Sequence, residues 1–183
     1  MGPKIFLLAS LLMGCTSVPS NQERMLSYIS ALQKAETGDV ADIKHRAATI
    51  EKFRFFFKDF STERVKTYFR DLYAEGAYFR DNVREVKGLR EMEDYFARSI
   101  EGVGSCKFDI VDVAHSGSHT YIRWIMHLQR NVGGDVLDYV GMSDIIVNLK
   151  GMIVFQQDYW DLSELLEEAP LLGRVVSWIK KSI

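Results

Sequence analysis

The first hundred residues show the apolar spacing of helices, with one interruption. Apolar side chains recur at every third or fourth position in 23–36, in 41–60 and again from Glu63 to Tyr73. This spacing predicts three helices, separated by "TGD" at 37–39 and begun afresh after "ST" at 61–62. A short aromatic run from Ala77 to Asp81 alternates like a strand, and 88–100 returns to helical spacing.

The second half of the chain reads as strands joined by tight turns. Alternating runs at 106–115, 119–131, 136–149 and 152–162 are separated by "SGS", "VGGD" and "KG", which is the hairpin signal. Helices followed by such a meander predict an α+β fold. We expect a cone in which N-terminal helices pack inside a strongly curved antiparallel or mixed sheet. Gly141, in mid-strand, would suit a bend or bulge.

Composition narrows the range of functions. The chain has 183 residues, 47% of them hydrophobic, which suits one domain with a sizeable core. Lys and Arg number 23 against 25 Asp and Glu, so no basic excess favours binding to nucleic acid. We expect no cofactor and no metal, because the sequence has no glycine-rich phosphate loop and only scattered histidines.

The first fourteen residues have the features of a signal peptide. Lys4 precedes an apolar run from Ile5 to Met13 that is too short to span a bilayer. "LMGC" at 12–15 resembles the lipobox of bacterial lipoproteins, which implies acylation of Cys15 after cleavage and a tether at 15–22. Thr16 after the cysteine resembles the outer-membrane sorting pattern, so we expect the periplasmic face of that membrane in the bacterial cell envelope. The alternative is an ordinary secretory signal with an incidental cysteine.

Two stretches carry a family resemblance. "YAEGAYFRDNVREVKGLREMEDYF" at 73–96 and "QQDYWD" at 156–161 resemble the nuclear-transport-factor-2-like superfamily, in its branch of SnoaL-like cyclases and ketosteroid isomerases. The resemblance implies a cone domain at 45–162, with an extra helical segment at 23–44. An amphipathic helical extension at 163–183 would pack against the domain, pack against a second protomer in a homodimer, or lie on a membrane.

The resemblance also implies roles for particular residues. Asp81 corresponds to the general base of the isomerases, and Asp144 to their protonated aspartate, which donates to an oxyanion. Asn82 stands where a proline is usual, and Phe57 stands where the isomerases carry a tyrosine hydroxyl, whose loss would weaken oxyanion stabilisation. We expect ligand contacts from Phe57, Tyr73, Phe79, Trp124, Met126, Met142, Asp158 and Trp160.

Each of the three acids also has a structural interpretation. Asp81 could be a turn residue that caps local backbone groups. Asp144, flanked on its strand face by Met142 and Ile146, could be a buried and satisfied acid. Asp158 shares a face with Val154, Gln156 and Trp160 by alternation and could form an ion pair with Arg123 or Arg130 at the sheet edge.

Two functional hypotheses follow. In the first, the protein is a lipid-anchored binding protein that holds a small apolar molecule or a partner inside its cone. In the second, it is an isomerase, cyclase or hydrolase in which Asp81 acts as base and Asp144 as acid or oxyanion donor. The missing hydroxyl at Phe57 favours the first hypothesis.

Overall fold

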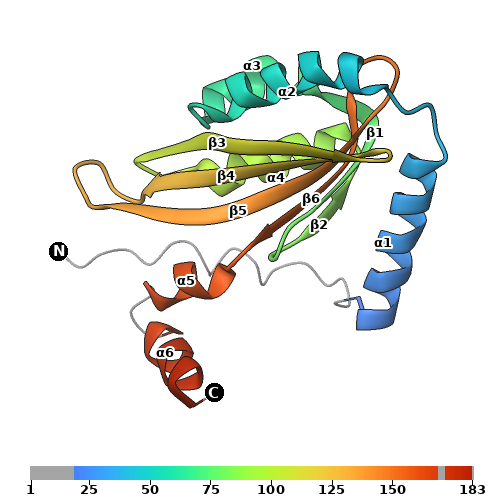
Figure 1. Ribbon diagram of the computed structural model, residues 1–183. Coiled ribbons are helices and arrows are strands. Elements are labelled where there is room, and N and C mark those ends of the chain that lie inside the picture. The colour runs from blue at the N-terminus through green and yellow to red at the C-terminus, as the bar shows by residue number, and fades with distance from the viewer. Residues whose placement is uncertain (1–18, 169–171, 183) are drawn as a thin grey trace.

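The computed structural model describes residues 19–168 and 172–182. The signal peptide and Cys15 therefore lie outside the described residues. Helices precede most of the strands, as the sequence predicts (Figure 1). The elements are α1 (Asn21–Glu36), α2 (Ile43–Phe57), α3 (Thr62–Leu72), β1 (Tyr73–Arg80), β2 (Glu85–Lys87), α4 (Leu89–Ile100), β3 (Ser105–Ser116), β4 (His119–Gln129), β5 (Val136–Val147), β6 (Ile153–Trp160), α5 (Leu162–Glu167) and α6 (Leu172–Ser182).

Side-chain caps fix where several helices begin. Ser20, Asp42, Ser61 and Asp161 each precede a helix and accept a hydrogen bond from a backbone N–H two or three residues later, which satisfies a donor that the helix leaves free. β1 begins at Tyr73, earlier than the predicted start at Ala77, because Tyr73 already has extended backbone angles as the last cap of α3.

The six strands form one mixed sheet in the order β2-β1-β6-β5-β4-β3. β1 and β6 pair in parallel, and the other neighbours pair antiparallel. The short strand β2, which the sequence pattern did not reveal, returns along β1 after a turn at 81–84. The core joins α2, α3 and α4 to one face of the sheet, called here the inner face. α1 packs on the opposite, outer face, where Tyr28 contacts Tyr78 and Phe155.

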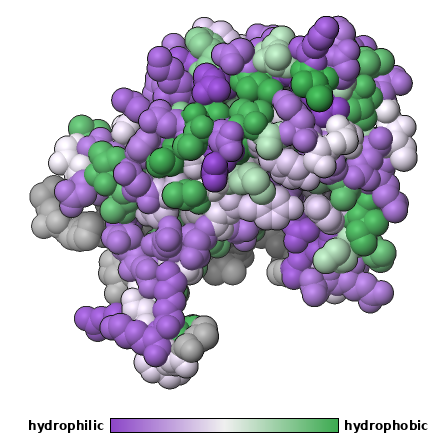
Figure 2. Space-filling model, in the orientation of Figure 1, coloured by the Kyte–Doolittle hydropathy of each residue, from purple (hydrophilic) through white to green (hydrophobic). Residues whose placement is uncertain are grey.

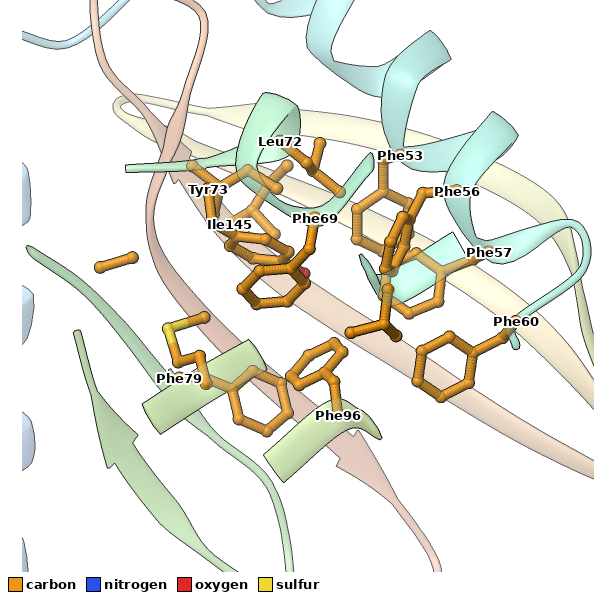
Figure 3. Close-up of a cluster of buried hydrophobic side chains, with 14 of the residues drawn as sticks. Phe53, Phe56, Phe57, Phe60, Phe69, Leu72, Tyr73, Phe79, Phe96 and Ile145 are labelled. Atoms are coloured by element: carbon orange, nitrogen blue, oxygen red, sulfur yellow. The ribbon is translucent and has the colours of Figure 1, made fainter. Parts of the chain in front are cut away.

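Aromatic rings fill the space between the helices and the inner face. Figure 3 shows rings from α2, α3, β1 and α4 converging on one another. Phe69 stacks on Tyr73 with 4.5 Å between ring centroids, and Phe79 meets Phe96 edge-on at 4.8 Å. Each buried ring contributes about 2–3 kcal/mol through removal of its surface from water. This part of the cone is therefore packed core.

Gly141 has a different role from the predicted bend. The β4–β5 and β5–β6 pairings run through it without a register shift. A Cβ built on Gly141 would lie 2.1 Å from Cη2 of Trp124, so the missing side chain makes room for the indole ring on the neighbouring strand. The register shifts of the sheet lie elsewhere, between Ile110 and Asp112, beside Val147, and between Tyr73 and Tyr78.

α5 and α6 follow β6 at the end of the chain. Leu165 of α5 packs against the main core, whereas α6 projects clear of the body of the molecule (Figure 2). Within residues 19–168 and 172–182, no helix combines the length and the apolar character needed to cross a membrane.

Candidate functional site

A line of hydrogen bonds crosses the inner face and converges on Asp158. Ser143 and Asp158 are directly paired residues of β5 and β6, so their side chains rise from the sheet together. The Ser143 hydroxyl donates to Oδ1 of Asp158 at 2.6 Å, and the Gln156 amide donates to the same oxygen at 2.8 Å. Behind them, Trp124 Nε1 donates to Ser143 at 3.0 Å, and the Tyr73 hydroxyl donates to Gln156 at 2.7 Å.

The carboxyl group of Asp158 is poised to exchange a proton near neutral pH. Burial raises the pKa of Asp158 to about 7, although the hydrogen bonds from Ser143 and Gln156 oppose this shift. The charge of Asp81 raises the same pKa further, because two nearby carboxylates resist being ionised together. Within the described residues Oδ2 of Asp158 receives no hydrogen bond, and the residue keeps some accessible surface. Oδ1 of Asp158 is thus held in place, while Oδ2 is available for proton exchange.

Asp81 combines the two roles that the sequence left open. Its Oδ1 accepts hydrogen bonds from the backbone N–H groups of Val83 at 2.8 Å and Arg84 at 2.7 Å, so it does cap the turn after β1. Its Oδ2 accepts from the hydroxyl of Tyr95 on α4 at 2.6 Å. Burial and the charge of Asp81 together raise the pKa of Tyr95, which keeps its proton. Asp81 therefore faces both the turn and the Asp158 site.

Asp144 lies on the other side of the sheet from this site, so its expected position in the pocket is wrong. Its neighbour Ser143 points inward, and successive side chains on a strand point to opposite faces. Asp144 Oδ1 is 2.7 Å from Nδ1 of His119, and Nε2 of that ring is 2.9 Å from Glu36 of α1. Met142 shares the face of Asp144 by alternation and is also away from the inner site.

The other expected ligand contacts divide into two groups. Phe57, Tyr73, Phe79 and Trp124 are almost fully buried and pack against other core side chains. A ligand could touch these rings only if their packing opened. Met126 and Trp160 are partly buried beside the same core and keep accessible surface. The Asn82 amide also donates to the backbone carbonyl of Trp160, which ties the turn after β1 to the end of β6.

Neither arginine proposed as a partner of Asp158 pairs with it. Arg123 pairs with Asp112 at 3.0 Å, and Arg130 pairs with Glu168 at 3.4 Å. Among the residues that the structure describes, no group of His, Cys, Asp and Glu side chains could hold a metal ion.

Two hollows of the described surface lie outside the inner site. One, of about 540 Å³, lies between α5 and α6, and the other, of about 240 Å³, lies between α2 and α3. The chemistry of the inner site therefore rests on Asp158 and Asp81 and the groups bonded to them.

Three residues of the site were not anticipated from the sequence. Ser143 and Gln156 became visible only with the β5–β6 register, because a hydroxyl or an amide in a strand carries no signal of its own. Tyr95 belongs to the apolar stripe of α4 and looks like an ordinary core residue until its hydroxyl is seen on Asp81.

Comparison with known proteins agrees with this fold. The model of the SnoaL-like domain family matches residues 53–154, more than half of the chain. No match was found among proteins with curated functions.

Several solved structures are similar in fold. A protein from Catenulispora acidiphila with a ketosteroid isomerase-like fold, solved with trimethylamine, has 15% identity and a TM-score of 0.56, covering 67% of this chain and 92% of its own. An LEH-like epoxide hydrolase from M. tuberculosis has 16% identity and a TM-score of 0.54, covering 75% and 97%. An NTF2-like protein of unknown function from Burkholderia pseudomallei has 12% identity and a TM-score of 0.56, covering 67% and 95%. With the family model matched across the cone, the chain belongs to the SnoaL-like domain family.

Proposed function

We propose that the protein binds a small molecule at the inner site and acts on it with Asp158 as general acid–base residue. The observation that carries this proposal is the asymmetric environment of the Asp158 carboxyl group. Its Oδ1 is fixed by Ser143 and Gln156, while its Oδ2 receives no hydrogen bond in the described parts of the chain. A base that is positioned through one oxygen can accept a proton on the other.

The surrounding groups suit a proton-transfer reaction. Asp158 would take a proton from a carbon acid or a water molecule and return it to another atom of the same substrate. Such steps serve isomerisation, cyclisation and hydrolysis alike, and proteins of this fold include one named as an epoxide hydrolase. Asp81 keeps the proton affinity of Asp158 high and positions Tyr95. The Tyr95 hydroxyl of α4 donates its proton to Asp81, so it does not replace the hydroxyl missing at Phe57.

The test compares two carboxylates that lie on opposite faces of the sheet. Purified protein would be assayed with a β,γ-unsaturated ketone, a poly-β-ketone and an epoxide, and the active class would be followed from pH 5 to 9. We expect a rate that inflects near pH 7 and falls at least about 100-fold in Asp158→Asn. Asp144→Asn serves as the matched control and should retain the rate. Equal rates in wild type and Asp158→Asn would overturn the proposal.

A binding function without turnover is the second candidate. It is favoured by the rings that fill much of the cone and by Phe57 in place of a hydroxyl donor. Native mass spectrometry of the purified protein would then reveal a co-purifying small molecule. Recovery of that molecule unchanged after long incubation, with no turnover in any of the three assays, would favour binding over catalysis.

We also propose that the mature chain is anchored in the bacterial envelope through acylated Cys15. The support is the sequence "LMGC" at the end of the apolar run, since two or more acyl chains hold a protein on a membrane stably. Growth with radiolabelled palmitate should label the wild type and Cys106→Ala equally, because Cys106 is buried in the fold. Cys15→Ala should carry no label, and equal labelling of all three proteins would contradict the anchor.

A further inference from the structure

α6 exposes an apolar stripe that no described part of the domain covers. Leu172, Val175, Trp178 and Ile179 recur at intervals of three and four residues, so they share one side of the helix. Their exposed fractions are 37%, 54%, 68% and 45%. Four large apolar side chains at this exposure on one short helix form a surface that normally has a partner.

The opposite side of α6 fixes its orientation against α5. Gly173 is buried there, and a Cβ at this position would lie 2.0 Å from the backbone oxygen of Glu167. Lys180 also pairs with Glu167 at 3.1 Å. Because the two helices meet through the glycine, Leu172, Val175 and Ile179 turn away from α5 toward solvent, on an element that stands clear of the body (Figure 2). Trp178 borders the hollow between the two helices, beside Glu167 and Glu168.

The charges of α6 are all of one sign. The helix contains Arg174, Lys180 and Lys181 and no acidic residue, in a chain whose net charge is negative. By helical spacing Arg174 and Lys181 lie on one side, next to Trp178. An apolar stripe with tryptophan, bordered by basic side chains, is the pattern of a helix that lies in the interface of an anionic membrane.

The position of α6 agrees with the proposed anchor. Figure 1 shows α6 and the N-terminal end of α1 projecting from the same side of the molecule. Only residues 16–20 separate Cys15 from α1, and five residues span at most about 18 Å. The exposed Met25 and Leu26 lie in the first half of α1, and the exposed Ile29 follows at its middle. A membrane that holds Cys15 would therefore face α6 as well.

We propose that α6 lies on the surface of an anionic lipid bilayer, with its apolar stripe in the headgroup boundary and Arg174 and Lys181 on lipid phosphates. A second copy of the chain is a weaker candidate for this surface. A two-fold contact places the same patch on both partners, and it would bring the basic side chains of the two helices together. The bilayer instead offers the opposite charge.

The first experiment reads the environment of Trp178 directly. Mature acylated protein would be reconstituted into vesicles of phosphatidylethanolamine and phosphatidylglycerol containing brominated acyl chains, which quench nearby tryptophan fluorescence. Trp124 is buried and Trp160 is half-buried against the core, so we expect Trp178→Phe to remove most of the quenching. Equal quenching in wild type and Trp178→Phe would overturn the proposal.

A matched pair of valine substitutions distinguishes an effect of the apolar stripe from an effect of exposed apolar side chains in general. Val175 lies on the stripe, and Val132, which is 91% exposed, lies in the β4–β5 turn. Val175→Glu should reduce the quenching of Trp178 several-fold, and Val132→Glu should leave it unchanged; equal effects would contradict an α6 contact. If a second copy covers the stripe, Trp178 stays unquenched and Val175→Cys forms a disulfide dimer. Labelling of Cys15 is a separate measurement, so failure of the anchor is distinguished from failure of the α6 contact.

Discussion

The two faces of the sheet each hold a buried aspartate carboxyl group, but with different hydrogen-bond partners. Among the residues that the structure describes, the Asp158 carboxyl group on the inner face receives hydrogen bonds only from uncharged donors, Ser143 and Gln156. Asp144 on the outer face meets an imidazole, which in turn contacts Glu36. Burial raises the pKa of both acids. Hydrogen bonds from uncharged donors oppose the shift at Asp158, whereas the hydrogen bond and charge of His119 oppose it at Asp144.

This difference shows where the fold accepts an energetic cost. A buried acid beside a second carboxylate makes the folded state less stable when it is ionised. The outer acid is compensated by a partner and helps to hold α1 on the sheet. Groups whose proton affinity is shifted by burial and a specific neighbour are concentrated at functional sites. The inner face is therefore the side of the sheet on which chemistry is expected.

The largest expected effect comes from Asp158→Asn. The folded pKa is about 7 against an ordinary value of 3.8, so the folded state binds this proton more tightly than the unfolded state. The contribution to stability is complete below about pH 4 and is lost as the pH rises to about 7. Asparagine can accept the same two hydrogen bonds without charge. We expect urea unfolding to show Asp158→Asn more stable than wild type by about 4 kcal/mol at pH 8, because each unit of pKa difference corresponds to about 1.4 kcal/mol.

The pH dependence supplies the control for that substitution. The gain over wild type should shrink toward zero as the pH falls below about 4, where the wild-type carboxyl group becomes protonated in the unfolded state as well as in the folded state. Asp144→Asn should show a smaller gain, because it also removes the charge that pairs with His119. A stability difference between Asp158→Asn and wild type that does not change from pH 4 to pH 8 would contradict the inner-face interpretation.

A smaller effect is expected from Gly141→Ala. The added methyl group would overlap the ring of Trp124, and crowding a packed core costs about 1–3 kcal/mol. The adjacent outer-face change Val140→Ala, at a residue that is 64% exposed, should change the free energy of unfolding by less than about 0.5 kcal/mol. In a Trp124→Leu background the cost of Gly141→Ala should fall, and an unchanged cost would refute the steric explanation.

The smallest expected effect concerns Asp144 on the outer face and the contact with α1 that it makes through His119. Burial opposes charging of His119, but the hydrogen bonds and charges of Glu36 and Asp144 raise its pKa. A histidine with a raised folded pKa contributes its full stability below about pH 6.5 and loses it as the pH rises through the folded value. Glu36→Gln should weaken the contact of α1 by about 1 kcal/mol.

Hydrogen exchange would measure that weakening locally. Amides of α1 should exchange up to about fivefold faster in Glu36→Gln than in wild type at pH 6, and the two proteins should converge as the pH rises. Amides in the middle of β5 should be unaffected. Equal acceleration in α1 and β5 would show that the substitution acts on the whole domain and not on the helix contact.

The sequence was sufficient for the fold class, and it named both acids of the candidate site, Asp81 and Asp158. Alternation correctly placed Gln156, Asp158 and Trp160 on one face. It was wrong for Val154, which packs with the outer-face cluster next to the bulge beside Val147. It also grouped Asp144 with Met142 correctly. It could not say which face was inner, since buried residues occur on both faces of β5. Choosing Asp144 over Ser143 is a one-position error, and in a strand such an error reverses the side of the sheet.

Other features depended on contacts between distant segments. The role of Gly141 requires knowing that Trp124 is its neighbour on β4. The hydroxyl of Tyr95 meets Asp81 only after α4 folds back along β1 and β2. Local spacing contains neither fact, so the site emerged from the register of the sheet and the packing of α4.

The parallel pairing of β1 with β6 has a consequence for how the chain reaches its folded state. β1 precedes most of the domain, and its partner is the last strand, with contacts such as Tyr73 to Ile153. A nascent chain therefore cannot close its sheet until nearly all of the domain is available, and pairings of long sequence separation form slowly. Until then, the N-terminal helices have no completed sheet to pack against. Under the proposed export of the chain across a membrane, this delay would keep premature folding from obstructing passage.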